Sequence, residues 1–292
     1  MTKRKVYAII ISYNGESEVL GTVKSICNQV DKVVVVDNAS SAATLIVLNE
    51  LKMAGDIQLI RLDDNLGIAY AQNVGIDFAQ KEGADWVLTL DQDSSCAKNM
   101  VDKLMHVAER YGKEKVGFCC PVINYQVPMQ EFSRVPGVEY IDYAISSGCL
   151  FPMSTLQSVG RQRDEYFIDS VDFEYCLRLA ARGYRMLKVN DAVLNHRLGV
   201  RKQVNLLGIV FSVSVHAPFR RYYTVRNHIF LVKMYWRYAP AFLIKKTFFL
   251  LLLFLQILFL ENKKMENIRQ CGRGMVDGFM GRGGKNTIVI HG

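Results

Sequence analysis

The stretch WVLTLDQDS, residues 86–94, joins a continuous apolar run to two carboxylates that stand two positions apart. A short apolar run bounded by polar residues is typical of a strand buried on both faces of a sheet. Asp91 and Asp93 would then lie at the mouth of the sheet, where their charges repel each other unless a cation is bound. Hard divalent ions take oxygen ligands and share substrate phosphates, so the pattern favours Mg²⁺ or Mn²⁺ bridging a nucleotide diphosphate.

The residues before this stretch alternate between apolar strands and amphipathic helices. Strands are predicted at residues 6–12, 32–37, 57–62 and 86–91, and helices at 16–30, 42–53 and 68–82. This alternation predicts an α/β fold with a parallel central sheet and crossover helices. Further on we expect helices at 98–111 and 171–182, a strand at 116–121 and a loop region up to about residue 147. Ligands of open α/β sheets bind beyond the carboxyl ends of the strands, so the site is expected there.

Polar residues follow the second strand in VVVVDNAS, residues 33–40. The strand delivers Asp37, Asn38 and Ser40 at its carboxyl end. A carboxylate in that place can accept the imide N–H of uracil or thymine, or a ribose hydroxyl. Helix capping by Asp or Ser explains the same residues equally well, so this segment alone leaves both interpretations open.

A second polar segment, DNLGIAYAQNVGI, covers residues 64–76. Asn65 and Gly67 indicate a turn, after which Ala71, Asn73 and Gly75 recur at a helix entry. Small residues permit a close backbone approach, and N–H groups at a helix N-terminus favour phosphate. A tight turn between strand and helix is the alternative. The segment does not match GxGxxG, so a dinucleotide-binding fold gains no support.

A third polar group opens the helix predicted at residues 171–182. Asp172 on the first turn of that helix can serve as a general base. Ordinary acid enrichment at a helix N-terminus is the alternative for Asp169, Asp172 and Glu174. That alternative is favoured for Asp169 and Glu174, and the position on the helix alone leaves both interpretations open for Asp172.

The net charge of +8 has its source in the C-terminal third. Residues 192–260 hold 10 Lys and Arg and no acid, and several of these bases alternate with aromatic residues. The bases in question are Arg220, Arg221, Arg226, Lys233 and Arg237. Such a segment suits an anionic partner, which could be nucleic acid, an anionic membrane leaflet or a diphosphate-bearing substrate. No nucleic-acid recognition motif accompanies it, so we expect no nucleic-acid partner.

An apolar run at residues 247–260 follows the basic segment. Fourteen helical residues reach about 21 Å, short of the roughly 30 Å hydrocarbon core. Lys245 and Lys246 interrupt the apolar pattern before it. We therefore predict a helix that lies in the membrane interface or packs on protein, rather than one that spans the bilayer.

The seven cysteines form no CxxC pair and no zinc spacing, which predicts reduced thiols in a cytosolic compartment. The N-terminal apolar run at residues 6–11 is too short for a signal peptide and indicates a buried first strand.

The ordered motifs ISYNG, VVVVDNAS, NLGIAYAQNVGI and DQD resemble those of the family 2 glycosyltransferases, specifically their bacterial rhamnosyltransferase branch. The resemblance covers about residues 5–230. It implies the GT-A fold, which is Rossmann-like with a mostly parallel central sheet and flanking helices, and here it is followed by C-terminal amphipathic or apolar helices. We accordingly predict a catalytic domain at residues 1–230 and a helical extension at 231–292 that associates with membrane or mediates oligomerisation.

The resemblance also assigns roles to residues. Asp37 contacts the base, Asp93 holds the metal, and Asp172 falls on the catalytic Asp, although Val171 occupies the usual Glu position. The implied nucleotide-sugar contacts are Ser12, Tyr13, Asn14, Asp37, Asn38, Asn65, Gly67, Asn73, Asp91, Gln92, Asp93 and His196. The expected metal ligands for Mg²⁺ or Mn²⁺ are Asp91, Asp93 and His196, a structural role being the alternative for the histidine. The expected acceptor contacts are Ser147, Gly148, Asp169 and Glu174, and a simple turn is the alternative for the loop at Ser146–Gly148.

The activity implied is inverting transfer of L-rhamnose from dTDP-β-L-rhamnose to a saccharide or a lipid-linked oligosaccharide in cell-surface polysaccharide synthesis. The enzyme would work at the cytoplasmic face of the membrane, and it could form a homo-oligomer. Processive relatives carry QxxRW, which this sequence lacks, so we expect one sugar per encounter. The alternatives are a different nucleotide sugar, a sugar nucleotidyltransferase, whose GxGxR opening is missing here, and a non-enzymatic membrane- or polysaccharide-binding module.

Overall fold

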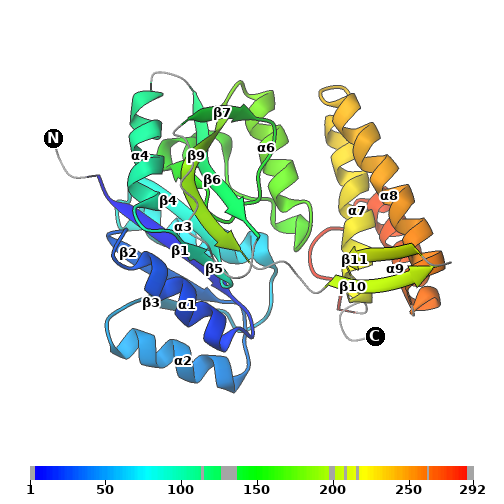
Figure 1. Ribbon diagram of the computed structural model, residues 1–292, viewed down its shortest axis with the longest axis horizontal. Helices are drawn as coiled ribbons and strands as arrows, with labels where there is room; N and C mark the ends of the chain where they lie inside the picture. The colour runs from blue at the N-terminus through cyan, green and yellow to red at the C-terminus, as the bar shows by residue number, and fades with distance from the viewer. Residues whose placement is uncertain are drawn as a thin grey trace. The chain divides into compact units, whose positions relative to one another are not determined.

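The computed structural model describes residues 4–112, 115–125, 137–196, 201–206, 209–214, 217–261 and 263–287. The chain divides into two compact units (Figure 1). The first unit holds Met1–Gln162 and Tyr175–Arg197, and the second holds Arg163–Glu174 and Leu198–Gly292. The boundary at residue 230 between the catalytic domain and the helical extension stays a prediction. That residue lies inside helix α7 (Pro218–Tyr235).

The first unit is built on a sheet whose N-terminal half is parallel. Strands β1 (Val6–Ser12), β2 (Lys32–Asp37), β3 (Gln58–Arg61) and β4 (Trp86–Asp91) pair in the order β3-β2-β1-β4. Successive residues of β1 point to opposite faces, so Ala8 and Ile10 join one apolar core and Ile9 joins the other. Three strand predictions are confirmed at their bounds, because runs that are apolar on both faces fit only the middle of a covered sheet.

Helices α1 (Glu16–Ile26), α2 (Ala42–Met53) and α3 (Ile68–Lys81) connect these strands. Helix α1 ends four positions before the predicted 30, because the chain turns there and the N–H of Gln29 donates to the carbonyl of Ile26 (2.8 Å). Helix α3 packs close to β1 at Gly75, where a Cβ would lie 2.3 Å from Ile9 Cγ2. A small residue is therefore required at that crossing for packing on β1, a role that the sequence analysis did not predict.

The rest of the sheet is mixed. Beyond β4 come β8 (Leu150–Pro152), β6 (Val116–Asn124), β9 (Arg185–His196) and β5 (Ser94–Cys96), and β7 (Val138–Ile141) also pairs with β9. Only β6 and β9 are parallel to each other in this half. Helices α4 (Met100–Arg110), α5 (Met153–Val159) and α6 (Val171–Ala181) complete the α/β arrangement. Of the loop region expected up to residue 147, residues 138–141 form β7, and 126–136 lie outside the described residues.

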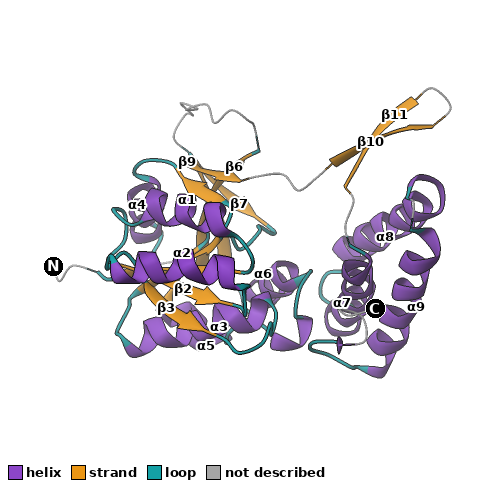
Figure 2. Cartoon of the chain, turned by 90° about the horizontal axis from the view of Figure 1, so that it is seen from below, coloured by secondary structure: helices purple, strands orange, loops and turns teal. Residues whose placement is uncertain are grey.

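The second unit contains a helical group and a hairpin. Helices α7, α8 (Pro240–Leu260) and α9 (Lys264–Met280) lie side by side (Figure 2). Strands β10 (Arg201–Leu206) and β11 (Ile209–Ser214) pair antiparallel. Val225, Ile257 and Cys271 form a core between the three helices. Gly274 allows the closest approach of α9 to α7, because a Cβ there would lie 2.3 Å from the carbonyl oxygen of Tyr222.

Helix α8 differs from its prediction. It begins at Pro240 and continues through Lys245 and Lys246, so the two lysines do not interrupt it, because lysine is a good helix former. The helix has 21 residues and a most apolar window with a mean hydropathy of 2.1, of which 11% is buried. Within the part of the chain that the structure describes, it is the one helix long and apolar enough to cross a membrane, by length and composition alone.

Candidate active site

A group of three metal-ligating side chains lies at one edge of the sheet in the first unit. Asp91 ends β4, Asp93 follows it, and His196 ends β9. The antiparallel pairing of β5 with β9 sets Ser94 opposite His196, 102 residues further along the chain, and this brings the imidazole to the carboxylates. One ligand atom from each of the three side chains lies within 4.8 Å of the other two. The two carboxylates and the histidine that we predicted as ligands are thus brought together.

The charges in this group favour a cation. Burial, together with the neighbouring charge of Asp93, raises the pKa of Asp91 to about 6. The Nδ1 atom of His196 lies 3.5 Å from an oxygen of Asp93. Two carboxylates and an imidazole suit a divalent ion such as Mn²⁺ or Mg²⁺, and positive charge between the carboxylates would relieve their repulsion. The residues present therefore fit a divalent metal.

A chain of hydroxyl groups connects the members of the group. The Ser94 hydroxyl lies 3.1 Å from Nδ1 of His196 and 2.7 Å from the Ser147 hydroxyl, whose oxygen in turn accepts the backbone N–H of Asp91 (3.0 Å). Groups that hydrogen-bond to metal-ligating residues, as these serine hydroxyls do, fix the orientation of the ligands. We predicted Ser147 as an acceptor contact, and its hydroxyl is occupied here. The sequence analysis missed Ser94, whose only signal is its position directly after the second carboxylate.

Ser12 and Asp37 lie next to each other at the ends of β1 and β2. Both side chains are buried, and Asp37 Oδ2 accepts the N–H of Ser40 (3.3 Å). The other carboxylate oxygen, Oδ1, and the Ser12 hydroxyl have no hydrogen-bond partner among the described residues. A buried carboxylate oxygen without a donor is costly, so a ligand that supplies an N–H or O–H would be stabilised there.

Several predicted nucleotide contacts hold the loops around this place. The amide of Asn38 donates to the side chain of Asn65 (3.0 Å) and accepts the N–H of Leu66 (3.0 Å). The amide of Gln92 accepts the N–H of Tyr13 (2.7 Å) and donates to its carbonyl (3.1 Å). These side chains shape the loops, and their direct contact with a ligand stays a prediction.

Three more predicted residues have local roles. Asn14 has a φ of 51° and its side chain accepts the N–H of Ser41 (2.8 Å). Gly67 has a φ of 91°, a backbone conformation that residues other than glycine rarely adopt. Asn73 is buried, and its amide exchanges two hydrogen bonds with the backbone of Gln162 (2.8 and 3.0 Å), which ties α3 to the segment after α5.

Gly148 has a structural requirement of its own. Its φ is 86°, and a Cβ there would lie 2.7 Å from Pro121 Cγ. The glycine therefore sets the turn that presents Ser147, whether or not it also contacts an acceptor.

The loop before α6, in the second unit, has an unusual backbone. Phe167, Asp169 and Ser170 have φ values of 60°, 70° and 60°. Left-handed conformations at residues other than glycine cost roughly 1–3 kcal/mol each and gather at functional sites. Asp172, our predicted base, is half-buried on the first turn of the helix that this loop opens.

Two buried residues of α7 hold this loop. The side-chain amide of Asn227 donates to the carbonyls of Tyr166 (2.9 Å), Ile168 (2.8 Å) and Asp169 (2.7 Å). The guanidinium of Arg226 donates to the carbonyls of Glu165 and Tyr166 (2.8 and 3.1 Å). Sequence reasoning missed the role of Asn227, because nothing in the local pattern shows which carbonyls it meets.

The basic segment is in part structural, which corrects its interpretation as a surface for an anionic partner. Arg226 is fully buried among carbonyls, and Arg221 is buried in an ion pair with Glu261. Glu261 also accepts hydrogen bonds from Gln256 (2.7 Å) and Asn267 (2.6 Å). The charge of Arg221 is therefore neutralised inside the helical group and is not available to a ligand.

The two remaining acids of the α6 region are engaged within the second unit. Glu174 is 1% exposed, and its carboxylate accepts hydrogen bonds from Arg163 (3.0 Å) and Tyr235 (2.7 Å). Asp169 accepts the hydroxyl of Thr224 (2.7 Å). These contacts support a structural role for Glu174, and the acceptor contacts of both residues stay predictions.

Replacing Asn227 with Ala should lower the free energy of unfolding by about 1–3 kcal/mol, because the loop carbonyls lose their shared donor. Urea unfolding followed by circular dichroism measures the change. Asn49→Ala, at an exposed position of α2, is the matched control and should be close to neutral. Equal stability of N227A and N49A would show that the amide does not hold the loop.

Comparison with known proteins agrees with this geometry. The model of glycosyl transferase family 2 matches residues 7–143. A dTDP-rhamnosyl transferase of Shigella flexneri, RfbF, is 29% identical over 294 residues, which cover 94% of this chain and 96% of that protein.

Solved structures of low identity share the fold. GalNAc-T7, solved with UDP, GalNAc and Mn²⁺, superposes with a TM-score of 0.61 at 15% identity and covers 82% of this chain. This chain spans about half of the GalNAc-T7 chain, 49%. TarS residues 1–349 of S. aureus, solved with UDP-GlcNAc, superposes at 0.53 and 16% identity, covering 95% of this chain and 73% of that one. With a family 2 model that matches residues 7–143 and a dTDP-rhamnosyl transferase that is similar along nearly the whole length, the chain is a glycosyltransferase with a family 2 domain.

Proposed function

We propose that this glycosyltransferase transfers L-rhamnose from dTDP-β-L-rhamnose, with inversion, to a saccharide or lipid-linked oligosaccharide of a cell-surface polysaccharide. The observation that carries the proposal is the group of Asp91, Asp93 and His196 at the sheet edge that also holds Asp37. That edge offers a cation site and an unpaired buried carboxylate, which suit the diphosphate and the base of a nucleotide sugar. The choice of rhamnose is supported by the likeness to RfbF.

The donor would be held through its base and its diphosphate. Oδ1 of Asp37 would accept the imide N–H of thymine, which gives this oxygen the donor it lacks. Asp91, Asp93 and His196 would hold Mg²⁺ or Mn²⁺. When bound, such an ion supplies positive charge that stabilises the leaving diphosphate. Ser94 and Ser147 would keep the ligands oriented through their hydrogen bonds.

Asp172 would be the general base. It takes the proton from the acceptor hydroxyl while the hydroxyl oxygen forms a bond to the anomeric carbon and the bond to the diphosphate breaks. Attack from the face opposite the leaving group inverts the anomeric configuration, with no covalent intermediate on the enzyme. The loop at 167–170, held by Arg226 and Asn227, fixes the start of α6 and therefore the place of this carboxylate. We keep Asp169 and Gly148 as candidate acceptor contacts.

We further propose that the enzyme lies in the cytoplasm, bound to the inner face of the membrane. Exposed apolar side chains cover much of α8, among them Phe248, Phe249 and Leu251, each 57% exposed. Lys245, Lys263 and Lys264 are exposed near the ends of this helix. Each such base near an anionic surface contributes about 1 kcal/mol. A second copy of the chain covering α8 is the alternative, and the membrane experiment below separates the two.

A donor panel tests the proposed reaction. With Mg²⁺ or Mn²⁺ and an acceptor saccharide, the protein should release nucleoside diphosphate faster from dTDP-rhamnose than from UDP-GlcNAc or GDP-mannose. Preference for another donor would overturn the rhamnose assignment.

Asp93→Ala should weaken donor binding chiefly when metal is present, because one of the metal ligands is lost. Equal donor affinity of D93A and the parent protein in the presence of metal would remove Asp93 from the site.

Asp172→Asn should lower turnover by roughly two to four decades and leave donor affinity nearly intact, because only proton transfer is affected. Turnover and calorimetric donor affinity are measured on the same preparation. Near-normal turnover, or a loss of donor binding as large as the loss of turnover, would contradict the role of base.

Binding to vesicles should rise with the fraction of anionic lipid and fall with salt. Replacing Phe248, Phe249, Leu251 and Leu252 with Ser should abolish most of it in a flotation assay. Substitution is preferable to truncation, because α8 and α9 supply Ile257 and Cys271 to the core of the second unit. The control replaces Ile46 and Met53, exposed apolar residues of α2, with Ser. Flotation of the α8 variant at the parent level, or no flotation of the parent protein at low salt, would refute membrane binding.

A further inference from the structure

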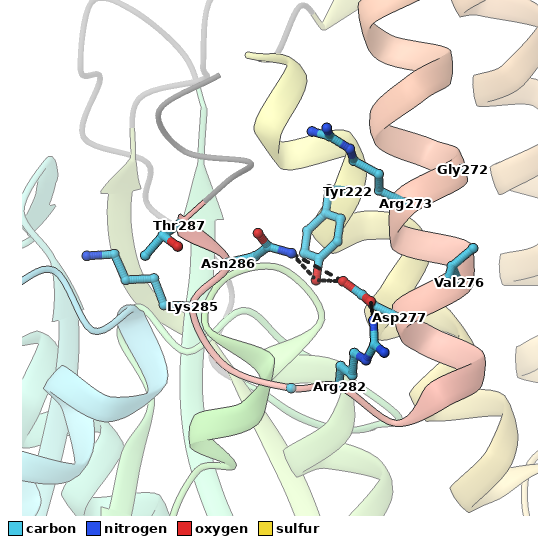
Figure 3. Close-up of a pocket in the computed structure, with 10 residues that line it drawn as sticks. Tyr222, Gly272, Arg273, Val276, Asp277, Arg282, Lys285, Asn286 and Thr287 are labelled. Carbon is cyan, nitrogen blue, oxygen red and sulfur yellow. Dashed lines mark hydrogen bonds and ion pairs between the residues drawn. The ribbon is translucent and has the colours of Figure 1, made fainter.

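A pocket of about 660 Å³ lies in the second unit, between α9 and the segment that follows it (Figure 3). Arg273 and Lys285 stand on opposite sides of this pocket and point away from each other, so they do not converge on one ligand group. In the first unit, by contrast, buried polar side chains of α3, β4 and the turn before β8 converge on the metal group, which consists of Asp91, Asp93 and His196.

The turn before β8 is held by β4. The Thr89 hydroxyl donates to the carbonyl of Ser146, and the carbonyl of Thr89 accepts the N–H of Gly148 (2.7 Å). Thr89 and Asp91 are two positions apart on β4, so their side chains lie on the same face of the sheet. The turn therefore lies against the end of β4, where the Ser147 hydroxyl accepts the backbone N–H of Asp91 (3.0 Å).

Gln72 of α3 holds the same turn from the helix. Its side chain is 1% exposed, and its amide nitrogen donates to the Ser146 hydroxyl (3.1 Å). The next residue, Ser147, has its hydroxyl 2.7 Å from that of Ser94, which lies 3.1 Å from Nδ1 of His196. A buried series of contacts therefore connects α3 with the metal group through the backbone of two serines.

The amide of Gln72 has one polar atom that is not satisfied. A glutamine side chain carries two N–H donors and an acceptor oxygen. The oxygen of Gln72, Oε1, is buried and has no hydrogen-bond partner among the described residues. An unpaired buried acceptor is unfavourable, and an apolar side chain of similar size, such as methionine, would avoid it. The stability of the fold alone therefore does not account for an amide at this position, whereas its bond to Ser146 does.

We propose that Gln72 is a positioning residue for the metal group, which it orients through Ser146 and Ser147. Groups that hydrogen-bond to metal-ligating residues keep those residues in the arrangement that an ion needs, and the loss of such a group lowers metal affinity. Gln72 itself is buried and acts only through the turn. The inference rests on the proposed role of Asp91, Asp93 and His196 as metal ligands.

Calorimetric titration with Mn²⁺ tests this role. Gln72→Met fills a similar space without a donor and should weaken Mn²⁺ binding about tenfold or more. Ser146→Ala removes the acceptor of the same bond and should cause a similar loss. The matched control is Thr155→Val, which deletes a buried hydroxyl that donates to the carbonyl of Val116 (2.9 Å) and should leave Mn²⁺ affinity unchanged. Parent-level affinity in Q72M or in S146A, or an equal loss in T155V, would overturn the proposal.

Thermal melting separates positioning from damage to the fold. Q72M should melt close to the parent protein, because removal of the unpaired oxygen offsets the lost bond, whereas T155V should melt lower. The affinity of Q72M for dTDP in EDTA should equal that of the parent, because the base-binding carboxylate of Asp37 is not part of this series of contacts. A loss of Mn²⁺ binding that only accompanies a lower melting temperature or weaker dTDP binding would reduce Gln72 to a general structural role and refute the proposal.

A double-mutant cycle with Ser147→Ala tests the route. Because Gln72 acts through Ser147, Q72M should reduce Mn²⁺ affinity little further in the S147A background. A further tenfold loss there would show that Gln72 acts by another route and contradict the proposal. Absence of Mn²⁺ binding by the parent protein would refute the metal group and this inference together. Mn²⁺ binding by the parent that Q72M retains in full would refute this inference and leave the metal group standing.

Discussion

The parallel register of β1 with its two neighbours is the constraint on which the site depends. Ser12 pairs with Asp37 on one side, and Ile11 pairs with Asp91 on the other. Neighbouring strands lie about 4.8 Å apart, so the two acids are about 10 Å from each other along one edge. Burial on both faces fixes this register, because a slip by one residue would exchange the two apolar cores.

The mixed half of the sheet supplies the site residues that the parallel half does not. Strand β9 returns along β5 and presents His196 to the carboxylates, while the turn at Gly148 presents Ser147. This chain of hydroxyl groups is enclosed by protein, so the metal-ligating side chains are already oriented before an ion binds. Orienting them on binding therefore costs little free energy. Burial and the charge of Asp93 both raise the pKa of Asp91, so positive charge between the two carboxylates would be favourable there.

The second unit uses its positive charges in two ways. Arg221 is buried in an ion pair with Glu261 and Arg226 is buried among carbonyls, so they connect the helices and hold the strained loop before Asp172. Arg273 forms no ion pair or hydrogen bond with the described residues, and it lines a pocket. The same residue type therefore has a structural role where an acid or carbonyls surround it, and stays partly exposed to solvent where they do not.

The sequence by itself determined the parallel strands, their crossover helices and the carboxylates at their ends, because these depend on local hydrophobic periodicity and on where each apolar run stops. It also predicted the helix that carries Asp172. Only the tertiary structure decided that His196 meets Asp93, that Ser94 and Ser147 connect them, and that Asn227 holds the loop at Tyr166. Each of these depends on pairing between segments at least about 50 residues apart, whose short or polar sequences carry no periodic signal of their partners. The same reason explains the missed strands β8 and β9 and the burial of two arginines that looked exposed from their charge alone.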